Sequence, residues 1–256
     1  MSFKVKRGLR HPEAPLLARR NPDLCLAFSM TSLQARLELM FIGLGIVALA
    51  IPWMAWARLR ILEKRHGRVL LVRGVTGEQA ARIVLLRGEI EQVPVDEALD
   101  FLGDNYAAAE PAVKLAQRTY FSRTLFAVVR AAGVAAHGLQ HRDCDRRVGR
   151  LGRLDGVLIL WGNAWPILAL GTMISPGRMT GLAVFAVMAI GLGIAQIISH
   201  RTVIDAIRRA RTELEGARLL DGHPKNEISD ALEAARLEHL ALSAKRTIWG
   251  ALRPRN

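Results

Sequence analysis

Residues 156–174 (GVLILWGNAWPILALGTMI) and 179–199 (MTGLAVFAVMAIGLGIAQIIS) are two apolar runs that contain no Lys, Arg, Asp, Glu or His. Only residues 175–178 separate them. An α-helix rises 1.5 Å per residue, so roughly 20 residues cross a hydrocarbon core about 30 Å thick. The pair of runs therefore predicts a transmembrane helical hairpin.

A third uncharged run, residues 39–57 (LMFIGLGIVALAIPWMAWA), precedes this hairpin by about a hundred residues. The chain of 256 residues is 51% hydrophobic with a mean hydropathy of +0.18. Its apolar residues concentrate in the three runs, whereas nearly all of its 36 Lys and Arg residues lie outside them. We therefore predict an all-α integral membrane protein with three transmembrane helices, a helical cytoplasmic loop domain and an amphipathic helical C-terminal tail.

Basic residues flank the three runs unevenly. They cluster after the first run, before the second and after the third, whereas the turn between the second and third has Arg178 alone. The clusters are Arg58, Arg60, Lys64 and Arg65; Arg146, Arg147, Arg150 and Arg153; and Arg201, Arg208, Arg209 and Arg211. Because cation-rich flanks stay in the cytoplasm, the loop and the C-terminus are predicted to be cytoplasmic and the N-terminus extracytoplasmic. The Arg-, Ala- and Leu-rich composition favours a bacterial inner membrane.

These patterns divide the chain into six segments. They are a basic, extracytoplasmic N-terminal segment (1–37), a first transmembrane helix (38–57), a cytoplasmic helical domain (58–155), a second (156–175) and a third (179–199) transmembrane helix, and a cytoplasmic helical tail (200–256). The N-terminal segment is expected to be mostly irregular, with a short helix over residues 16–20. Thr31 or Ser32 is expected to cap a helix that begins near Leu33 and runs into the first transmembrane helix.

Local signals predict helices inside the cytoplasmic domain. Thr76 and Gln79 form a capping box, which predicts a helix over residues 77–86. Pro94 opens a second helix that Gly103 closes. Residues 107–140 continue as a long apolar helical segment. It is expected to pack within the domain or on a partner, with a re-entrant or interfacial helix as the alternative. Residues 68–75 fit either a short strand or a helix end.

The tail is predicted to continue the third transmembrane helix through about residue 220. Residues 222–224 (GHP) break it, and a helix restarts at Ser229. Residues 229–252 alternate Leu, Ile and Trp with charged positions, which predicts an amphipathic helix that packs on the domain, on a second subunit or on lipid headgroups.

The net charge of +13 and the two cysteines limit the possible partners. In a membrane protein, anionic headgroups account for basic flanks at about 1 kcal/mol per nearby cation, so nucleic acid is not an expected partner. Cys25 and Cys144 are too few and too far apart for a disulfide framework. The transmembrane runs contain no His for haem and no acidic residue for a proton relay, so no cofactor is expected.

One spacing is typical of metal ligands. His137, His141 and Cys144 stand at i, i+4 and i+7, and share one face if the helix extends that far; Asp143 or Asp145 would support a zinc shell. The alternative is a polar helix end near the membrane. The chain contains no H-E-x-x-H, Walker loop, nucleophile elbow or dinucleotide fingerprint, so no catalytic residue is predicted.

Small and polar residues inside the runs predict helix contacts. IGLGI occurs twice, at 42–46 and 190–194, and the residues expected at helix interfaces are Gly43, Gly45, Ala189, Gly191 and Gly193. The intramembrane polar residues are Asn163, Thr172 and Gln196. A hydrogen bond between Asn163 and Gln196, worth about 1 kcal/mol, is the expected role of that pair.

The layout of one span, a helical loop of about a hundred residues, two spans and a helical tail resembles the TolQ/ExbB/MotA proton-channel family. Residues 166–172 (PILALGT) are similar to that family's P-x-x-G-L-L-G-T stretch, although one residue shorter, and residues 186–190 carry no hydroxyl. The resemblance implies an oligomeric ion-conducting or energy-coupling subunit, with Thr172 in the ion path and a partner supplying the acidic residue.

Three functional hypotheses follow from the sequence. The first is a non-enzymatic membrane subunit that scaffolds a larger complex, contacting other integral membrane proteins and lipids in a hetero-oligomer, because no catalytic motif is present and two amphipathic regions need cover. The alternative is the ion-conducting subunit. An enzyme with a membrane-proximal metal at the His137 cluster is a third hypothesis.

Overall fold

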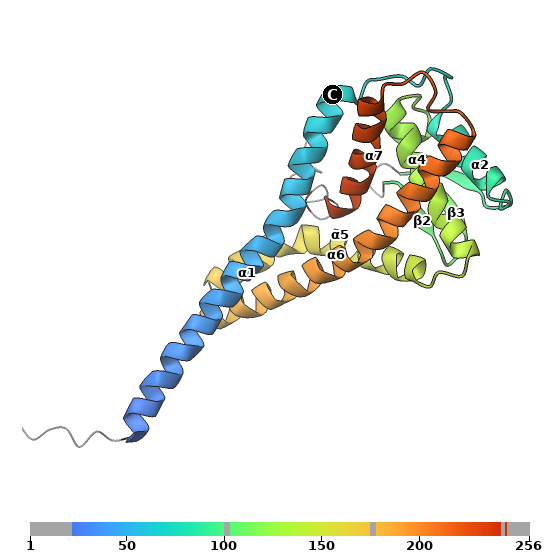
Figure 1. Cartoon of the computed structure of the whole chain (residues 1–256). Helices are drawn as coiled ribbons and strands as arrows, with labels where there is room; N and C mark the ends of the chain where they lie inside the picture. Colours follow the sequence, from blue (N-terminus) through green and yellow to red (C-terminus); the bar gives the residue numbers. More distant parts are fainter. Residues whose placement is uncertain (1–21, 100–102, 175–177, 242–243, 245–256) are drawn as a thin grey trace, which may run out of the picture.

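The computed structural model describes residues 22–99, 103–174, 178–241 and 244. It consists of a polar domain and a stalk of long helices that leads away from it (Figure 1). The elements are α1 (Pro22–His66), α2 (Gly77–Arg87), β1 (Val95–Ala98), β2 (Asn105–Ala107), β3 (Ala112–Ala116), α3 (Gln117–Tyr120), α4 (Leu125–Arg142), α5 (Arg147–Ile174), α6 (Arg178–Gly216) and α7 (Lys225–Leu240).

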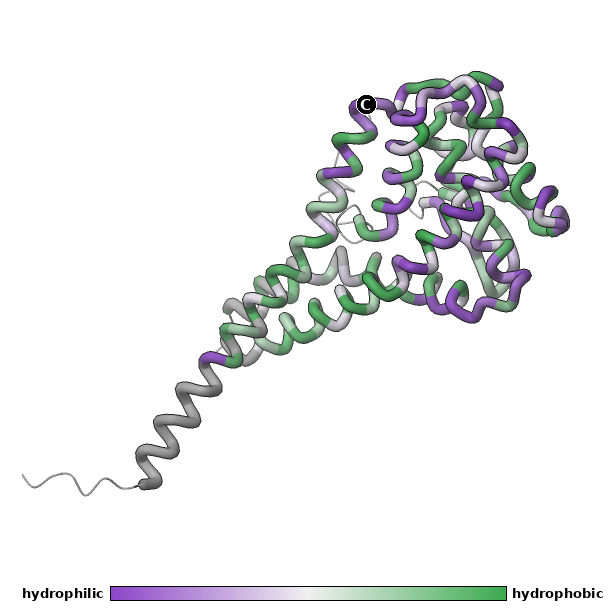
Figure 2. Tube along the Cα trace, viewed as in Figure 1, coloured by the Kyte–Doolittle hydropathy of each residue, from purple (hydrophilic) through white to green (hydrophobic). Residues whose placement is uncertain are grey.

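The stalk comprises the apolar parts of α1, α5 and α6, residues 42–57, 157–174 and 181–199. α6 packs against both α1 and α5. Segments Ile42–His66 and Gly181–Gly216 are each long and apolar enough to cross a membrane, by length and composition. Figure 2 shows the described parts of these helices as largely hydrophobic, in contrast to the mixed polarity of the domain. The structure therefore shows a mostly helical chain with two candidate membrane spans.

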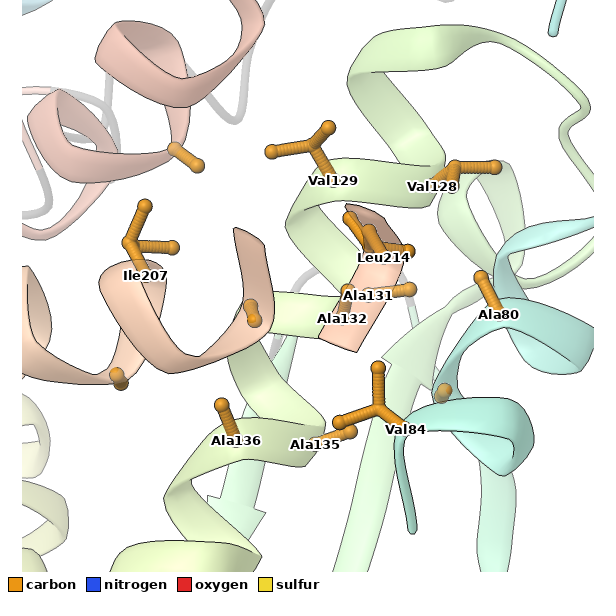
Figure 3. Close-up of a cluster of buried hydrophobic side chains, with 14 of the residues drawn as sticks. Ala80, Val84, Val128, Val129, Ala131, Ala132, Ala135, Ala136, Ile207 and Leu214 are labelled. Carbon is orange, nitrogen blue, oxygen red and sulfur yellow. The ribbon is translucent and has the colours of Figure 1, made fainter. Parts of the chain in front are cut away.

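Helix α4 is the centre of the polar domain. Thr124 begins it, since its hydroxyl accepts a hydrogen bond from the Ala127 N–H at 3.3 Å. Figure 3 shows its buried alanines and valines between α2 and α6. Ala132 and Ala136 are fully buried, and such small side chains let the flanking helices approach closely. α7 and the domain end of α1 also pack on this core.

A three-stranded sheet, in the order β1-β3-β2, corrects the all-α prediction for the domain. β1 pairs parallel to β3, with Val95 opposite Val113, where a helix after Pro94 was predicted. β2 pairs antiparallel to β3, so the predicted helix over 107–140 is wrong before α3 and α4. These strands depend on pairing between distant segments, and local helical periodicity carries no information about that pairing.

Other local predictions have mixed outcomes. The capping box is confirmed: Gln79 N–H donates to the Thr76 hydroxyl, Thr76 N–H donates to the Gln79 side chain, and α2 follows. Residues 68–75 form neither a helix end nor a regular strand, because Leu70 makes only an isolated bridge to Thr124. α1 begins at Pro22, earlier than the predicted start near Leu33, so residues 22–32 are helical, contrary to the prediction; the short helix over 16–20 lies outside the described residues.

The tail also differs from the prediction in its boundaries. α6 ends at Gly216, and Gly222 adopts a φ of +88°, which favours glycine. Pro224 is the N-cap residue of α7, which therefore begins at Lys225, earlier than the predicted Ser229. α7 buries Leu232 and its alanines against the domain. Of the three surfaces expected to cover the tail helix, the domain is therefore the one that α7 packs on.

Candidate functional site

A cavity of about 1150 Å³ lies beside α4, where the polar domain meets α5. One stripe of α4 lines it, together with the first turns of α5, two side chains of α6, the end of α7, strand β2 and the turn after α4. The α4 positions are Arg130, Gly133, Val134, His137 and His141. Pockets of this size accommodate ligands larger than a single amino acid, so this cavity is the candidate functional site.

Arg130 forms a charged centre at one end of the cavity. Its side chain is 12% exposed and forms an ion pair with Glu238 of α7. Glu63 of α1 lies 3.3 Å away and Asp104 lies 3.9 Å away. Desolvation opposes the charge of Arg130, but these three carboxylates raise its pKa overall. The guanidinium thus links α4, α1, α7 and the residue that precedes β2.

Asp104 is the most buried carboxyl group of this centre, with 3% of its side chain exposed. It accepts hydrogen bonds from the Ala116 N–H at 2.7 Å and from the Thr119 hydroxyl at 2.8 Å. Burial, followed by repulsion from Glu238, raises the pKa of Asp104. Three carboxyl groups around one arginine favour a proton on one of them.

The sequence analysis did not select the Arg130 centre. The sequence nevertheless contained a signal, because Arg130 and His137 are the only basic residues in the apolar stretch 125–138. A lone arginine in such a stretch indicates a buried ion pair. Its partners come from residues 63, 104 and 238, and only the tertiary structure brings these together.

The two histidines of α4 are held by neighbouring side chains. Nδ1 of His137 lies 2.8 Å from the Gln140 side-chain oxygen, and Nδ1 of His141 lies 2.9 Å from the Tyr106 hydroxyl. The Gln140 amide is fully buried and donates to the Thr202 carbonyl at 3.0 Å and to Asp205 at 2.8 Å. Gln140 therefore joins α4 to α6 and also contacts His137.

Cys144 does not share the face of His137 and His141. α4 ends at Arg142, and Cys144 adopts a φ of +60° in the following turn, where its side chain is exposed. Asp145 accepts a hydrogen bond from the Arg147 N–H at 2.9 Å, and Asp143 pairs with Arg209 and Arg142. Within the described residues no three His, Cys, Asp or Glu side chains are grouped closely enough to hold a metal ion.

The residues predicted at helix interfaces occupy different environments. A Cβ on Gly45 would lie 2.7 Å from Cβ of Ala186, so α1 and α6 approach closely there. A Cβ on Gly193 would lie 3.4 Å from Cβ of Ala48, and Ala189 is buried. Gly43 and Gly191 are exposed, with nothing within 4 Å of a Cβ.

Gln196 is a buried polar residue of the stalk, and its expected bond to Asn163 stays a prediction because the Asn163 side chain lies outside the described part of the structure. The Gln196 amide donates to the carbonyls of His239 and Leu240, both at 2.9 Å, and so caps the end of α7. Asn163 and Thr172 belong to α5, and their side chains lie outside the described part of the structure.

The fold and cavity define a class: a helical chain with candidate membrane spans and a polar domain whose cavity adjoins them. Residues 40–248 match the family described as "Putative neutral zinc metallopeptidase", and the chain belongs to that family. It is similar to the "Putative membrane protease YugP" of Bacillus subtilis, with 24% identity over 212 residues, covering 79% of this chain and 90% of the relative. No solved structure matches the chain significantly.

This membership corrects the predicted function. The expectation of a non-enzymatic scaffold in a membrane complex is wrong, and so is the alternative of an ion-conducting subunit, because the family and the relative are described as peptidases. The scaffold expectation depended in part on the absence of familiar motifs, and the ion-channel alternative depended on a resemblance in layout; neither is specific enough to outweigh the family match. The membrane character agrees with the relative's name.

The family description implies zinc. Catalytic zinc sites use three protein ligands, and helix-borne ones place two histidines at i and i+4 around a glutamate base. His137 and His141 have that spacing, but Gly138 follows the first, and the described residues supply no third ligand near them. The residues therefore do not fit a helix-borne zinc centre of this kind.

Proposed function

We propose that this chain is a membrane-bound member of the peptidase family that engages polypeptide segments in the cavity beside α4, at the membrane surface. The observation that carries the proposal is the position of the cavity. Its walls include Val148, Gly149 and Gly152 of α5, immediately before that helix becomes the apolar stalk. A segment that leaves the membrane near α5 would meet the cavity directly.

The proposed placement uses α1, α5 and α6 as three membrane spans. Large apolar side chains remain exposed along all three helices, which lipid rather than water would cover. They include Ile46 at 63%, Leu160 at 70%, Ile167 at 65% and Ile198 at 65% exposure. The cationic flanks then place the polar domain and α7 in the cytoplasm, beside the anionic headgroups of a bacterial inner membrane.

The cavity walls suit an extended polypeptide in two ways. The α5 wall contains three glycines, at positions 149, 152 and 156, and no atom lies within 4 Å of a Cβ placed on any of them. Such a wall leaves backbone exposed and space beside it for another chain. Lys114, Arg146 and Arg153 also line the cavity and offer charged donors to carbonyl and carboxylate groups.

A photocrosslinking and cleavage experiment tests this proposal. The full chain in nanodiscs is incubated with an unstructured peptide that carries a benzophenone and a fluorophore–quencher pair. Crosslinks are mapped by mass spectrometry and cleavage is followed by fluorescence, since cleavage is what the family description suggests. Crosslinks on the cavity walls, or cleavage at this site, are expected in the unaltered chain.

Two matched tryptophan variants of α5 locate the activity. Gly152→Trp fills the cavity from an open position, whereas Gly171→Trp adds the same side chain at an open position outside the cavity. Gly152→Trp is expected to reduce labelling or cleavage roughly tenfold, equivalent to about 1.4 kcal/mol of binding, and Gly171→Trp to leave it unchanged. Peptide labelling confined to other surfaces, unaffected by Gly152→Trp and without cleavage, would contradict the proposal.

A further inference from the structure

The chain has seven histidines, and none of them is followed by glutamate. A helix-borne H-E-x-x-H centre that uses a histidine of α4 has three possible positions along the helix. It begins at residue 133, 137 or 141, and its glutamate position is then Val134, Gly138 or Arg142. None of the three offers a carboxylate to serve as the base.

The surroundings of these positions differ. Gly138 faces the core, because a Cβ there would lie 3.3 Å from Ile90 Cδ1 and from Leu85 Cδ2, and 3.4 Å from Tyr106 Cε2. Gly133 and Val134 both line the cavity. The place that a side chain on Gly133 would take is filled by Cδ1 of Ile207 from α6. The cavity-facing position is thus occupied by packed hydrocarbon.

The facing helix α6 does not complete a metal site either. Its two side chains in the cavity wall are Val203 and Ile207, which have no atom that binds a metal. The buried Gln140 amide, which is not part of the cavity wall, donates hydrogen bonds to the Thr202 carbonyl and to Asp205 of α6. Hydrocarbon packing and these hydrogen bonds join α4 to α6 along the cavity.

We infer that this member of the family is not built around a helix-borne zinc centre, and that its α4–α6 junction is held by Gln140 and by Ile207 on Gly133 without a metal ion. The junction therefore requires no zinc for its stability. This inference concerns the same cavity as the proposed function but does not depend on peptide binding, so the two can fail separately.

Metal analysis and melting of the full chain in detergent test the inference. The protein is incubated with equimolar Zn²⁺, freed of excess metal, and analysed for zinc; its melting temperature is measured with Zn²⁺ and with EDTA. Substoichiometric zinc and the same melting temperature in both conditions are expected, because a ligand stabilises a protein only when it binds the folded state. About one zinc per chain, whose removal lowers the melting temperature and which His137→Ala abolishes, would overturn the inference.

Two glutamine variants examine the hydrogen-bonded junction. Gln140→Ala is expected to lower the melting temperature equally with Zn²⁺ and with EDTA, whereas Gln92→Ala, at an exposed position outside the cavity, leaves it unchanged. A melting temperature unaffected by Gln140→Ala would contradict the role of Gln140. Where Gln140→Ala does not fold, the zinc content of the unaltered chain still decides the metal question.

Discussion

The polar domain and the stalk bury hydrocarbon in different ways. In the domain, α4 is surrounded by protein, and Val128, Val129 and Leu125 are fully buried. In the stalk, Ile46, Leu160 and Ile167 stay more than half exposed. The comparison teaches that protein contacts cover the hydrocarbon of the first region, whereas in the second much of it stays uncovered, as the proposed membrane placement requires. The cavity lies where these two conditions meet.

The largest expected effect comes from the charged centre of the domain. Arg130→Met leaves Asp104 and Glu238 buried without their cation, and should lower the free energy of unfolding by about 3–5 kcal/mol. Denaturant unfolding in detergent measures it. Arg82→Met is the control, because the Arg82–Glu78 pair is an exposed i, i+4 pair worth about 0–1 kcal/mol. Equal losses of unfolding free energy in the two variants would show that the Arg130 centre contributes no more than the exposed Arg82–Glu78 pair.

A lysine in the stalk tests the apolar solvent. Ile46→Lys places a charge on the exposed face of α1 and should impair membrane insertion by about 2.5–3.5 kcal/mol at mid-bilayer depth. Alkaline extraction of membranes measures the integrated fraction. Leu86→Lys, equally helical and 58% exposed but on α2 of the domain, should leave that fraction unchanged. If Ile46→Lys integrates as well as the unaltered chain, water rather than lipid covers this face.

Close packing beside the cavity predicts a coupled pair. Gly133→Ala brings a methyl group against Cδ1 of Ile207, the end of a side chain that can shift, so this variant should be about 1 kcal/mol less stable than Gly149→Ala, which gains the same helix propensity without the contact. Ile207→Val in the same chain should recover part of that loss, since contacting residues are not additive. Gly149→Ala, with open space at its Cβ, serves as the control in thermal melting. Additive effects of the two substitutions would exclude the contact.

The smallest effect concerns pH. Burial raises the folded-state pKa of Asp104, so the folded chain holds this proton more tightly than the unfolded chain. Its contribution to stability is therefore lost as the pH rises from the ordinary value of 3.8 through the raised pKa. Asp104→Asn removes this dependence on pH. Its melting temperature should therefore fall less steeply with rising pH over this range than that of the unaltered chain. The same slope of melting temperature against pH in both proteins would show that Asp104 is ionised throughout this range.

Local signals in the sequence correctly predicted several elements. The capping box of Thr76 and Gln79 predicted α2, because both of its hydrogen bonds form within one helical turn. The apolar runs at 39–57 and 179–199 fall in the helices that carry the two candidate spans. These features depend on residues a few positions apart, which is the range over which a single sequence is informative.

The sequence by itself determined the hydrocarbon stretches, the cationic flanks and the absence of any histidine followed by glutamate. Only the tertiary structure decided the sheet, in which Val95 pairs with Val113, and the charged centre, in which Arg130 meets Glu63, Asp104 and Glu238. It also decided the cavity and the Ile207–Gly133 contact. The physical reason is that pairing and burial join residues tens of positions apart, whereas helical periodicity and capping act within a few residues.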